Sequence, residues 1–235
     1  MLGLMETGRN ESICPGVWRV GGEALTGGDD CLVYLLDLGE PVLIDCGSGR
    51  HTQRLLDNIT SAGVDPQRLH TLLLTHAHVD HIGAAARLRR LSGCRVVAHS
   101  ADRAAIESAD PVYTVAPLYG IELEPCPVDL AVDGDRLLEF TAGRLELLHI
   151  PGHTAGSLAA LFRSEAGTVL FGQDLHGPFS TAFASDLAAW RSSLERLAAL
   201  EADILCEGHF GVFRPAGRVR QFIEQQLAEP KVLLS

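Results

Sequence analysis

Three of the ten histidines and one aspartate fall within the six residues from His76 to His81. The short apolar run Leu72–Leu74 directly precedes this cluster, and the Ala-, Leu- and Arg-rich segment Ile82–Leu91 after it predicts a helix. The cluster therefore lies where a strand ends in a loop, and functional side chains of α/β folds gather at such strand ends. The segment predicts an α/β fold with a functional site at this position.

The residue types and their spacing point to metal binding. In extended backbone, residues two apart point the same way, so His76 and His78 are expected to reach one ion. Asp80 and His81, beyond the turn, are expected to reach a second point nearby. Imidazole and carboxylate ligands suit zinc, and also iron or manganese, better than calcium, which takes oxygen ligands alone. The segment therefore predicts two neighbouring divalent metal ions, with zinc as the first choice.

Short apolar runs alternate with helical patterns in both halves of the chain. In the first half, strands are predicted at Val17–Gly21, Cys31–Leu38, Pro41–Ile44, Leu69–Thr75 and Arg95–Ala98, and helices at Thr52–Ala62, at Ile82–Leu91 and after Ser100. In the second half, strands are predicted at Arg136–Phe140, Arg144–Ile150, Ser157–Arg163, Val169–Phe171 and Ile204–Leu205, with a helix capped by Asp186 and another from about Pro215 to Leu227. This order predicts two sheets packed face to face with helices outside.

Composition narrows the class of protein. A chain of 235 residues, 46% hydrophobic and 21% charged, suits one globular domain over residues 1–235. The formal net charge of −11 disfavours nucleic acid and anionic membranes as partners. The segment Met1–Asn10 lacks the pattern of a secretory signal, and the six cysteines form no C-x-x-C pair, so a cytoplasmic protein with buried thiols is expected.

The string H-x-H-x-D-H at His76–His81 resembles the signature of the metallo-β-lactamase superfamily. Further landmarks of that family have counterparts here in the same order along the chain. They are Asp45 in Leu43-Ile44-Asp45-Cys46-Gly47, His153 in Pro151-Gly152-His153-Thr154, Asp174 in Phe171-Gly172-Gln173-Asp174 and His209 in Glu207-Gly208-His209. The resemblance covers nearly the whole chain and implies a four-layer αββα sandwich with two mixed β-sheets.

The resemblance also implies a role for each of these residues. His76, His78 and His153 would hold a first metal ion, Asp80, His81 and His209 a second, and Asp174 would bridge the two. Asp80 and Asp174 are the carboxylates expected to take part in catalysis. Asp45 is expected either to orient the histidine loop or to act only as a turn aspartate.

Departures from subfamily patterns narrow the expected reaction to a glyoxalase II-like hydrolysis of a small-molecule thioester or ester by a metal-bridging hydroxide. Only Phe210–Ser235 follows the last ligand, so the C-terminal helical domain of glyoxalase II, which grips glutathione, is expected to be absent. Gly177 stands where lactonases of this family carry a tyrosine. Asp174 stands where the commonest zinc β-lactamases carry a cysteine.

Three alternatives stay open at this point. One is a persulfide dioxygenase-like oxidoreductase with a single iron, the second a lactonase or β-lactamase-like hydrolase, and the third a binding module that keeps its metal only for folding. A small-molecule substrate is expected, with pocket walls from the loops at 108–127 and 177–184 and with His176 as a further candidate to line the pocket. The oligomeric state, a homodimer included, is left open. His51, His70, His99 and His149 are expected to be structural or solvent-facing.

Overall fold

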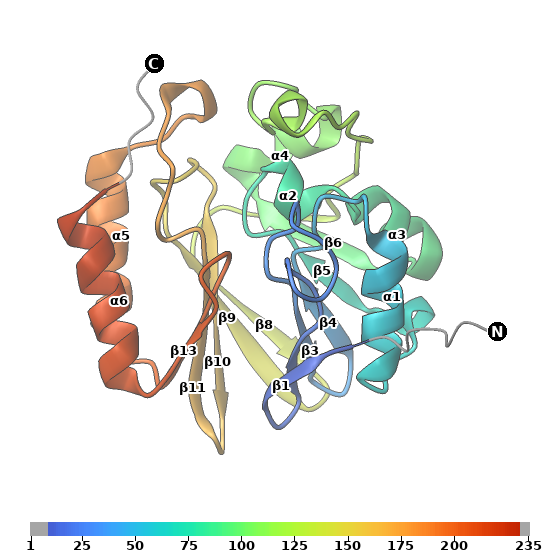
Figure 1. The fold of residues 1–235 in the computed structure, drawn as a ribbon, viewed down its shortest axis with the longest axis horizontal. Helices are drawn as coiled ribbons and strands as arrows, with labels where there is room; N and C mark the ends of the chain where they lie inside the picture. The colour runs from blue at the N-terminus through green and yellow to red at the C-terminus, as the bar shows by residue number, and fades with distance from the viewer. Residues whose placement is uncertain (1–8, 231–235) are drawn as a thin grey trace.

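The computed structural model describes residues 9–230, whose strands form two mixed sheets that face each other (Figure 1). The first sheet contains, in spatial order, β1 (Glu11–Cys14), β2 (Val17–Arg19), β3 (Tyr34–Asp37), β4 (Pro41–Ile44), β5 (Thr71–Leu73), β6 (Arg95–His99) and β7 (Leu130–Val132). The second contains β13 (Val212–Phe213), β12 (Ile204–Glu207), β11 (Gly167–Gln173), β10 (Leu158–Ser164), β9 (Gly143–His149) and β8 (Arg136–Phe140).

Strand direction decides where the functional loops meet. In the first sheet, β1 to β4 are antiparallel, whereas β4, β5, β6 and β7 run parallel. Parallel strands present their carboxyl ends at one edge, so the segments after β4, β5 and β6 emerge side by side. In the second sheet only β11 and β12 are parallel, and the segments that follow these two strands also emerge together.

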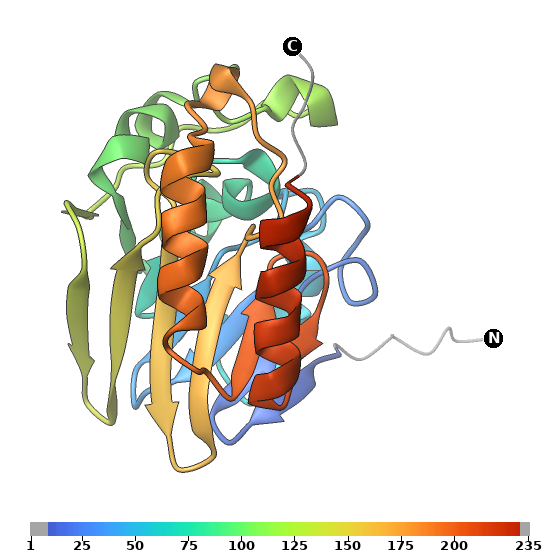
Figure 2. The same ribbon diagram turned by 90° about the vertical axis from the view of Figure 1, so that its left-hand side faces the viewer.

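Helices cover the outer face of each sheet (Figure 1), and Figure 2 shows the two that lie over the second sheet. The first sheet is covered by α1 (Thr52–Ser61), α3 (Ala85–Ser92) and α4 (Ser100–Ser108), and the second by α5 (Leu187–Ala198) and α6 (Ala216–Ala228). Short helices complete the connections: η1 (Pro66–Arg68), α2 (Val79–Ile82), η2 (Ala116–Tyr119) and η3 (Thr181–Phe183). The layers therefore follow the predicted αββα order.

Alternation along the strands divides the apolar residues between layers. On β3, Leu35 packs toward the helices of the first sheet, while Tyr34 and Leu36 face the second sheet. Tyr34 packs edge-on against Phe171 of β11, with ring centroids 5.5 Å apart. Its buried hydroxyl donates a hydrogen bond of 2.8 Å to the carbonyl of Glu207, so the polar atom is satisfied within the apolar layer.

The predicted strands and helices are found with small shifts, and two differ in an informative way. The helix expected at Ile82–Leu91 is split into α2 and α3, and α2 begins inside the histidine cluster. The strand expected at Cys31–Leu38 starts only at Tyr34, because the amides of Cys31 and Leu32 instead donate to the carbonyls of Asp80 and Gly208. The short strands β1, β7 and β13 were not predicted.

Other expectations concern the interior and the surface. All six cysteines are buried and unpaired. Trp190, which the helical spacing of its segment predicts to be a core residue, is 3% exposed, and its indole N–H donates to the carbonyl of Leu175. Asp186 caps α5 by accepting from the amides of Ala188 and Ala189. Across residues 9–230, no helix combines the length and apolar character that a membrane crossing requires.

Candidate metal centre

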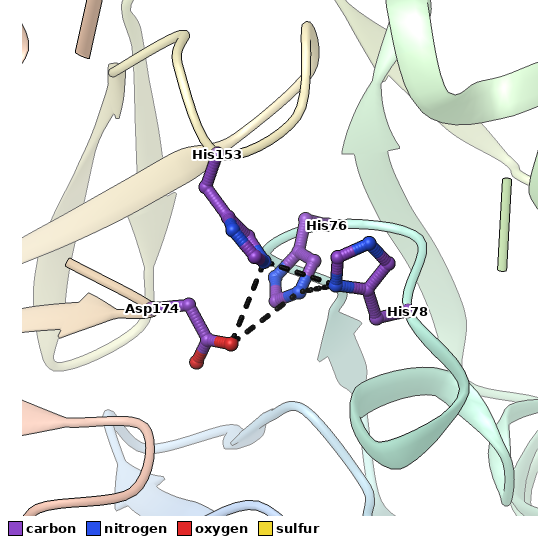
Figure 3. Close-up of side chains that lie close together, drawn as sticks. All are labelled: His76, His78, His153 and Asp174. Carbon is purple, nitrogen blue, oxygen red and sulfur yellow. Dashed lines mark hydrogen bonds and ion pairs between the residues drawn. The ribbon is translucent and has the colours of Figure 1, made fainter. Parts of the chain in front are cut away.

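Three imidazoles and one carboxylate meet where the two sheets present their strand ends (Figure 3). His76 and His78 follow β5, His153 lies between β9 and β10, and Asp174 follows β11. Nδ1 of His78 lies 3.1 Å from Nε2 of His76 and 2.9 Å from Nε2 of His153. We call this group the first cluster; all four of its side chains are buried.

Asp80, His81 and His209 form a second cluster beside the first. Nε2 of His209 lies 3.4 Å from Nε2 of His81 and 3.3 Å from Oδ2 of Asp80. Asp80 and His81 sit on α2 and are buried, whereas the side chain of His209, which follows β12, is 32% exposed. The second cluster is therefore the one that solvent and a substrate can approach.

The carboxylate of Asp174 contacts both clusters, with a different oxygen toward each. Oδ2 lies 3.5 Å from Nε2 of His153 and 3.9 Å from Nε2 of His76. Oδ1 lies 3.2 Å from Nε2 of His81 and 3.3 Å from Nε2 of His209. The structure therefore brings all seven predicted residues together and places Asp174 between the two groups.

The spacing of these atoms fits metal ions. Ligands about 2.0–2.1 Å from a tetrahedral zinc ion lie roughly 3.3 Å from one another. The contacts within the first cluster run from 2.9 to 3.9 Å. Two of them join two imidazole nitrogens, of which only one can donate a proton to the other. A cation between the lone pairs removes this conflict, so the donor set suits zinc, iron or manganese.

The electrostatics of the two clusters differ. Burial, together with the neighbouring imidazoles, lowers the pKa of His78 to about 3, and burial lowers that of His153 to about 4, so both rings keep their lone pairs. Burial also opposes charging of His209, but the carboxylates of Asp174 and Asp80 outweigh it and raise its pKa to about 10. A metal ion that binds His209 would therefore displace a proton.

Asp45, at the end of β4, bonds to the histidine loop rather than only to its own turn. Its Oδ1 accepts from the amide of Thr75 at 2.8 Å, and its Oδ2 accepts from the Thr75 hydroxyl and contacts Nδ1 of His81, each at 2.7 Å. Gln173 of β11 donates to the same oxygen. The left-handed backbone of Asp45, with φ of 58°, is one that aspartate tolerates better than most residues.

Glu207 was not predicted, although it supports the loop of His209. Its side chain is fully buried, and Oε2 accepts from the amides of His209 and Phe210 at 2.7 and 2.8 Å. Oε1 lies 2.7 Å from Nδ1 of His176, whose ring centroid is 5.4 Å from that of His209. His176 thus lies next to the second cluster. The available signal was a single acidic residue directly after the apolar run 204–206.

A hollow of about 490 Å³ opens beside His209. It is bounded by the connection that follows β2 and by the loop of His209, with Glu23, Leu25 and Phe210 among its walls. Its size falls within the range of small-molecule sites. Away from the clusters, His99 and His149 stack on each other with ring centroids 3.8 Å apart, as expected of structural histidines.

The sequence of this chain is similar to those of known proteins. The family model of the metallo-beta-lactamase superfamily matches residues 26–209. The chain is 29% identical to a hydroxyacylglutathione hydrolase of Pseudomonas paraeruginosa over 185 residues, which cover 77% of this chain and 62% of that protein. It is 32% identical to the hydroxyacylglutathione hydrolase of Pseudomonas aeruginosa over 137 residues, which cover 58% of this chain and 45% of that protein. The chain thus spans less than two thirds of the length of these relatives.

Solved structures share the fold at lower identity. A metallo-beta-lactamase from Cronobacter sakazakii superposes with a TM-score of 0.79 at 21% identity, covering 94% of each chain. A subclass B3 metallo-beta-lactamase of Bradyrhizobium japonicum gives 0.79 at 20% identity, covering 95% of this chain and 92% of that one. These likenesses show the architecture. The family match over most of the sequence, joined to a sandwich with both histidine clusters at its strand ends, shows that this chain belongs to the metallo-beta-lactamase superfamily.

Proposed function

We propose that this protein is a binuclear metal-dependent hydrolase that cleaves a small-molecule thioester or ester, in the manner of glyoxalase II. The observation that carries the proposal is the position of Asp174, which presents one oxygen to each cluster. A carboxylate shared in this way suits two neighbouring ions rather than one. Similarity to hydroxyacylglutathione hydrolases supports a thioester as the substrate class.

Two divalent ions, zinc in the first place and iron or manganese otherwise, would be held by His76, His78, His153 and Asp174 and by Asp80, His81, His209 and Asp174. A pair of ions supplies a nucleophilic hydroxide at neutral pH and stabilises the charge that develops on the leaving group. The protein residues would fix the geometry: the first cluster is buried, so water would reach the ions from the side of His209, and Asp80 and Asp174 would supply the negative charge that holds them. The exposed side of His209 leaves a path for the substrate.

The surroundings of the clusters suit a small substrate. The hollow beside His209 has both apolar and charged walls, which fits an acyl group with a polar end. The net charge of −11 supports the proposal that neither nucleic acid nor a membrane is the partner. The buried, unpaired thiols of all six cysteines support a reducing, cytoplasmic location.

The test begins with the metal content of protein purified without added metal, measured by mass spectrometry. Thioester, lactone, β-lactam and phosphodiester substrates are then assayed side by side. We expect two transition-metal ions per chain and the highest kcat/KM on thioesters. Asp174→Ala should reduce hydrolysis to the background rate, while Asp57→Ala on the exposed face of α1 should not change it. One iron per chain with oxygen uptake, or full activity in Asp174→Ala, would refute the proposal.

A further inference from the structure

Asp102 lies in the first turn of α4, outside both clusters, and its carboxylate is buried at 1% exposure. Oδ2 accepts from the amide of Ala77 at 3.0 Å and from the hydroxyl of Thr154 at 2.9 Å. Oδ1 accepts from the amide of Gly156 and the hydroxyl of Tyr113, both at 2.9 Å. All four partners are donors, so together they match an ionised carboxylate, which only accepts.

Three of these donors, Ala77, Thr154 and Gly156, belong to the loops that carry the first cluster. Ala77 lies between His76 and His78, and Thr154 directly follows His153. Figure 3 shows these two loops entering the site from opposite sides, one from each sheet. A single oxygen of Asp102 therefore links the two loops that present all three imidazoles of the first cluster, through the Ala77 amide and the Thr154 hydroxyl.

Helix capping does not account for this carboxylate. An acidic residue in the first turn normally interacts with the free amides of its own helix. In the described structure, the side-chain bonds of Asp102 go to other segments instead, and the first turn of α4 is capped by Nδ1 of His99. The approach to Gly156 is so close that an added Cβ there would lie 2.4 Å from Oδ1. The carboxylate is thus directed at the loops.

The burial of Asp102 has an energetic cost that its bonds offset. Burial raises the pKa of this carboxyl, and the bonds from Thr154, Tyr113 and the backbone act in the opposite direction. A buried carboxylate is retained only where such partners are held in place. The same bonds therefore hold the two loops at a fixed separation, as outer hydrogen bonds do around metal ligands.

We propose that Asp102 is a positioning residue for the first metal ion, acting through Ala77 and Thr154 on His76, His78 and His153. Asp45 plays the corresponding part for the second cluster, through His81. The inference rests on the proposed metal pair but not on the substrate, because its test measures metal binding and not hydrolysis.

The test compares Asp102→Asn with Asp45→Asn by competition of each protein with a chelator of known zinc affinity. In Asp102→Asn an amide N–H faces donors, so the loops lose part of their link. We expect Asp102→Asn to weaken the binding of one zinc ion by about 10–100-fold and to leave the affinity for the other unchanged. His78→Ala disrupts the first cluster and His209→Ala the second. Cobalt(II) spectra of these two variants therefore serve as references that identify which ion is affected. Asp102→Asn at one equivalent of cobalt should resemble His78→Ala, and Asp45→Asn should resemble His209→Ala.

Milder variants keep the test decisive if Asp102→Asn does not fold. Thr154→Val removes one hydrogen bond to Oδ2 of Asp102 and should weaken the binding of the first ion only. Thr154→Ser keeps the hydroxyl and should bind this ion with the affinity of the wild type. Asp129→Asn is the matched control, because Asp129 accepts from the amide of Val96 and pairs with Arg89 at the opposite end of the strands. It should lower stability without changing either zinc constant. Equal weakening of both ions, or unchanged zinc constants in Asp102→Asn and Thr154→Val, would overturn the proposal.

Discussion

Oδ2 of Asp45 lies 2.7 Å from Nδ1 of His81, and both side chains are fully buried. The two residues are far apart in the sequence, and their contact places a proton on Nδ1 of the ring. Nε2 then faces Asp80, Asp174 and His209, so it is the nitrogen that would bind a metal ion. The carboxylate at the end of β4 therefore fixes how His81 enters the second cluster.

Replacing Asp45 by asparagine should reduce the affinity for the second metal ion more than it reduces the stability of the fold. The amide keeps the shape but loses the charge that orients His81, and outer partners of metal ligands are worth about 10–100-fold in affinity. Unfolding experiments on the metal-free protein should show a loss of about 1–3 kcal/mol from the buried donors that lose an acceptor. Asp37→Asn, which alters only the bond to the amide of Gly39 in an exposed turn, is the control. Unchanged zinc constants in Asp45→Asn would contradict this role.

Glu207→Gln should disturb the loop that carries His209. Glu207 accepts from two backbone amides of this loop and contacts His176, and glutamine offers one acceptor where the carboxylate offers two. We expect a loss of about 1–3 kcal/mol in the free energy of unfolding and weaker binding of the second zinc ion. Chemical denaturation and zinc competition measure the two effects. Glu224→Gln on the exposed face of α6, which loses only a surface pair with Arg220, should change neither.

His76, His78, Asp80 and His81 could be predicted from their spacing directly after a short apolar run. The resemblance to a known family implied the other three ligands, His153, Asp174 and His209. Asp102 and Glu207 could not be predicted from the sequence. An acidic residue in the first turn of a helix looks like a partner of the helix dipole, and the loops that Asp102 joins come from different sheets. The strands β7 and β13 are too short to show alternation. Their pairing depends on neighbours that only the folded chain supplies.

The stacked pair of His99 and His149 should make stability depend on pH. Burial and the facing His149 ring lower the pKa of His99 to about 4, while a nearby acidic residue, Asp133, acts against this. An unfolded histidine titrates near about 6.5. Between these values the unfolded chain binds the proton and the folded one does not. The stabilising contribution is therefore complete above about pH 6.5 and is lost as the pH falls toward about 4.

His99→Asn isolates this contribution. Asparagine still offers an acceptor to the amide of Ala101, which caps α4, but does not titrate. Urea unfolding of metal-free wild type and variant between pH 4 and 8 should give a shallower decline for the variant below about pH 6.5. The metal ligands titrate in both proteins, so the difference between the two curves reports His99. Parallel curves throughout the range would show that the stacked pair carries no such linkage.

Gly152→Ala should be among the most damaging single substitutions in the chain. Gly152 directly precedes His153 and has φ of 149°, and an added Cβ would lie 2.3 Å from Cα and 2.6 Å from the backbone nitrogen of Trp190. The obstacle is backbone, and α5 is held there by the bond from the amide of Asp186 to the carbonyl of Gly152. The loop must therefore move, and His153 with it. We expect a loss of at least about 1–3 kcal/mol in stability, together with weaker binding of the first zinc ion.

Gly217→Ala, within α6 and with no atom near the added Cβ, should instead stabilise by about 0.5–1 kcal/mol. A Gly152→Ala protein that matches wild type in both thermal unfolding and zinc affinity would show that α5 can yield, and that the position of His153 does not depend on this contact.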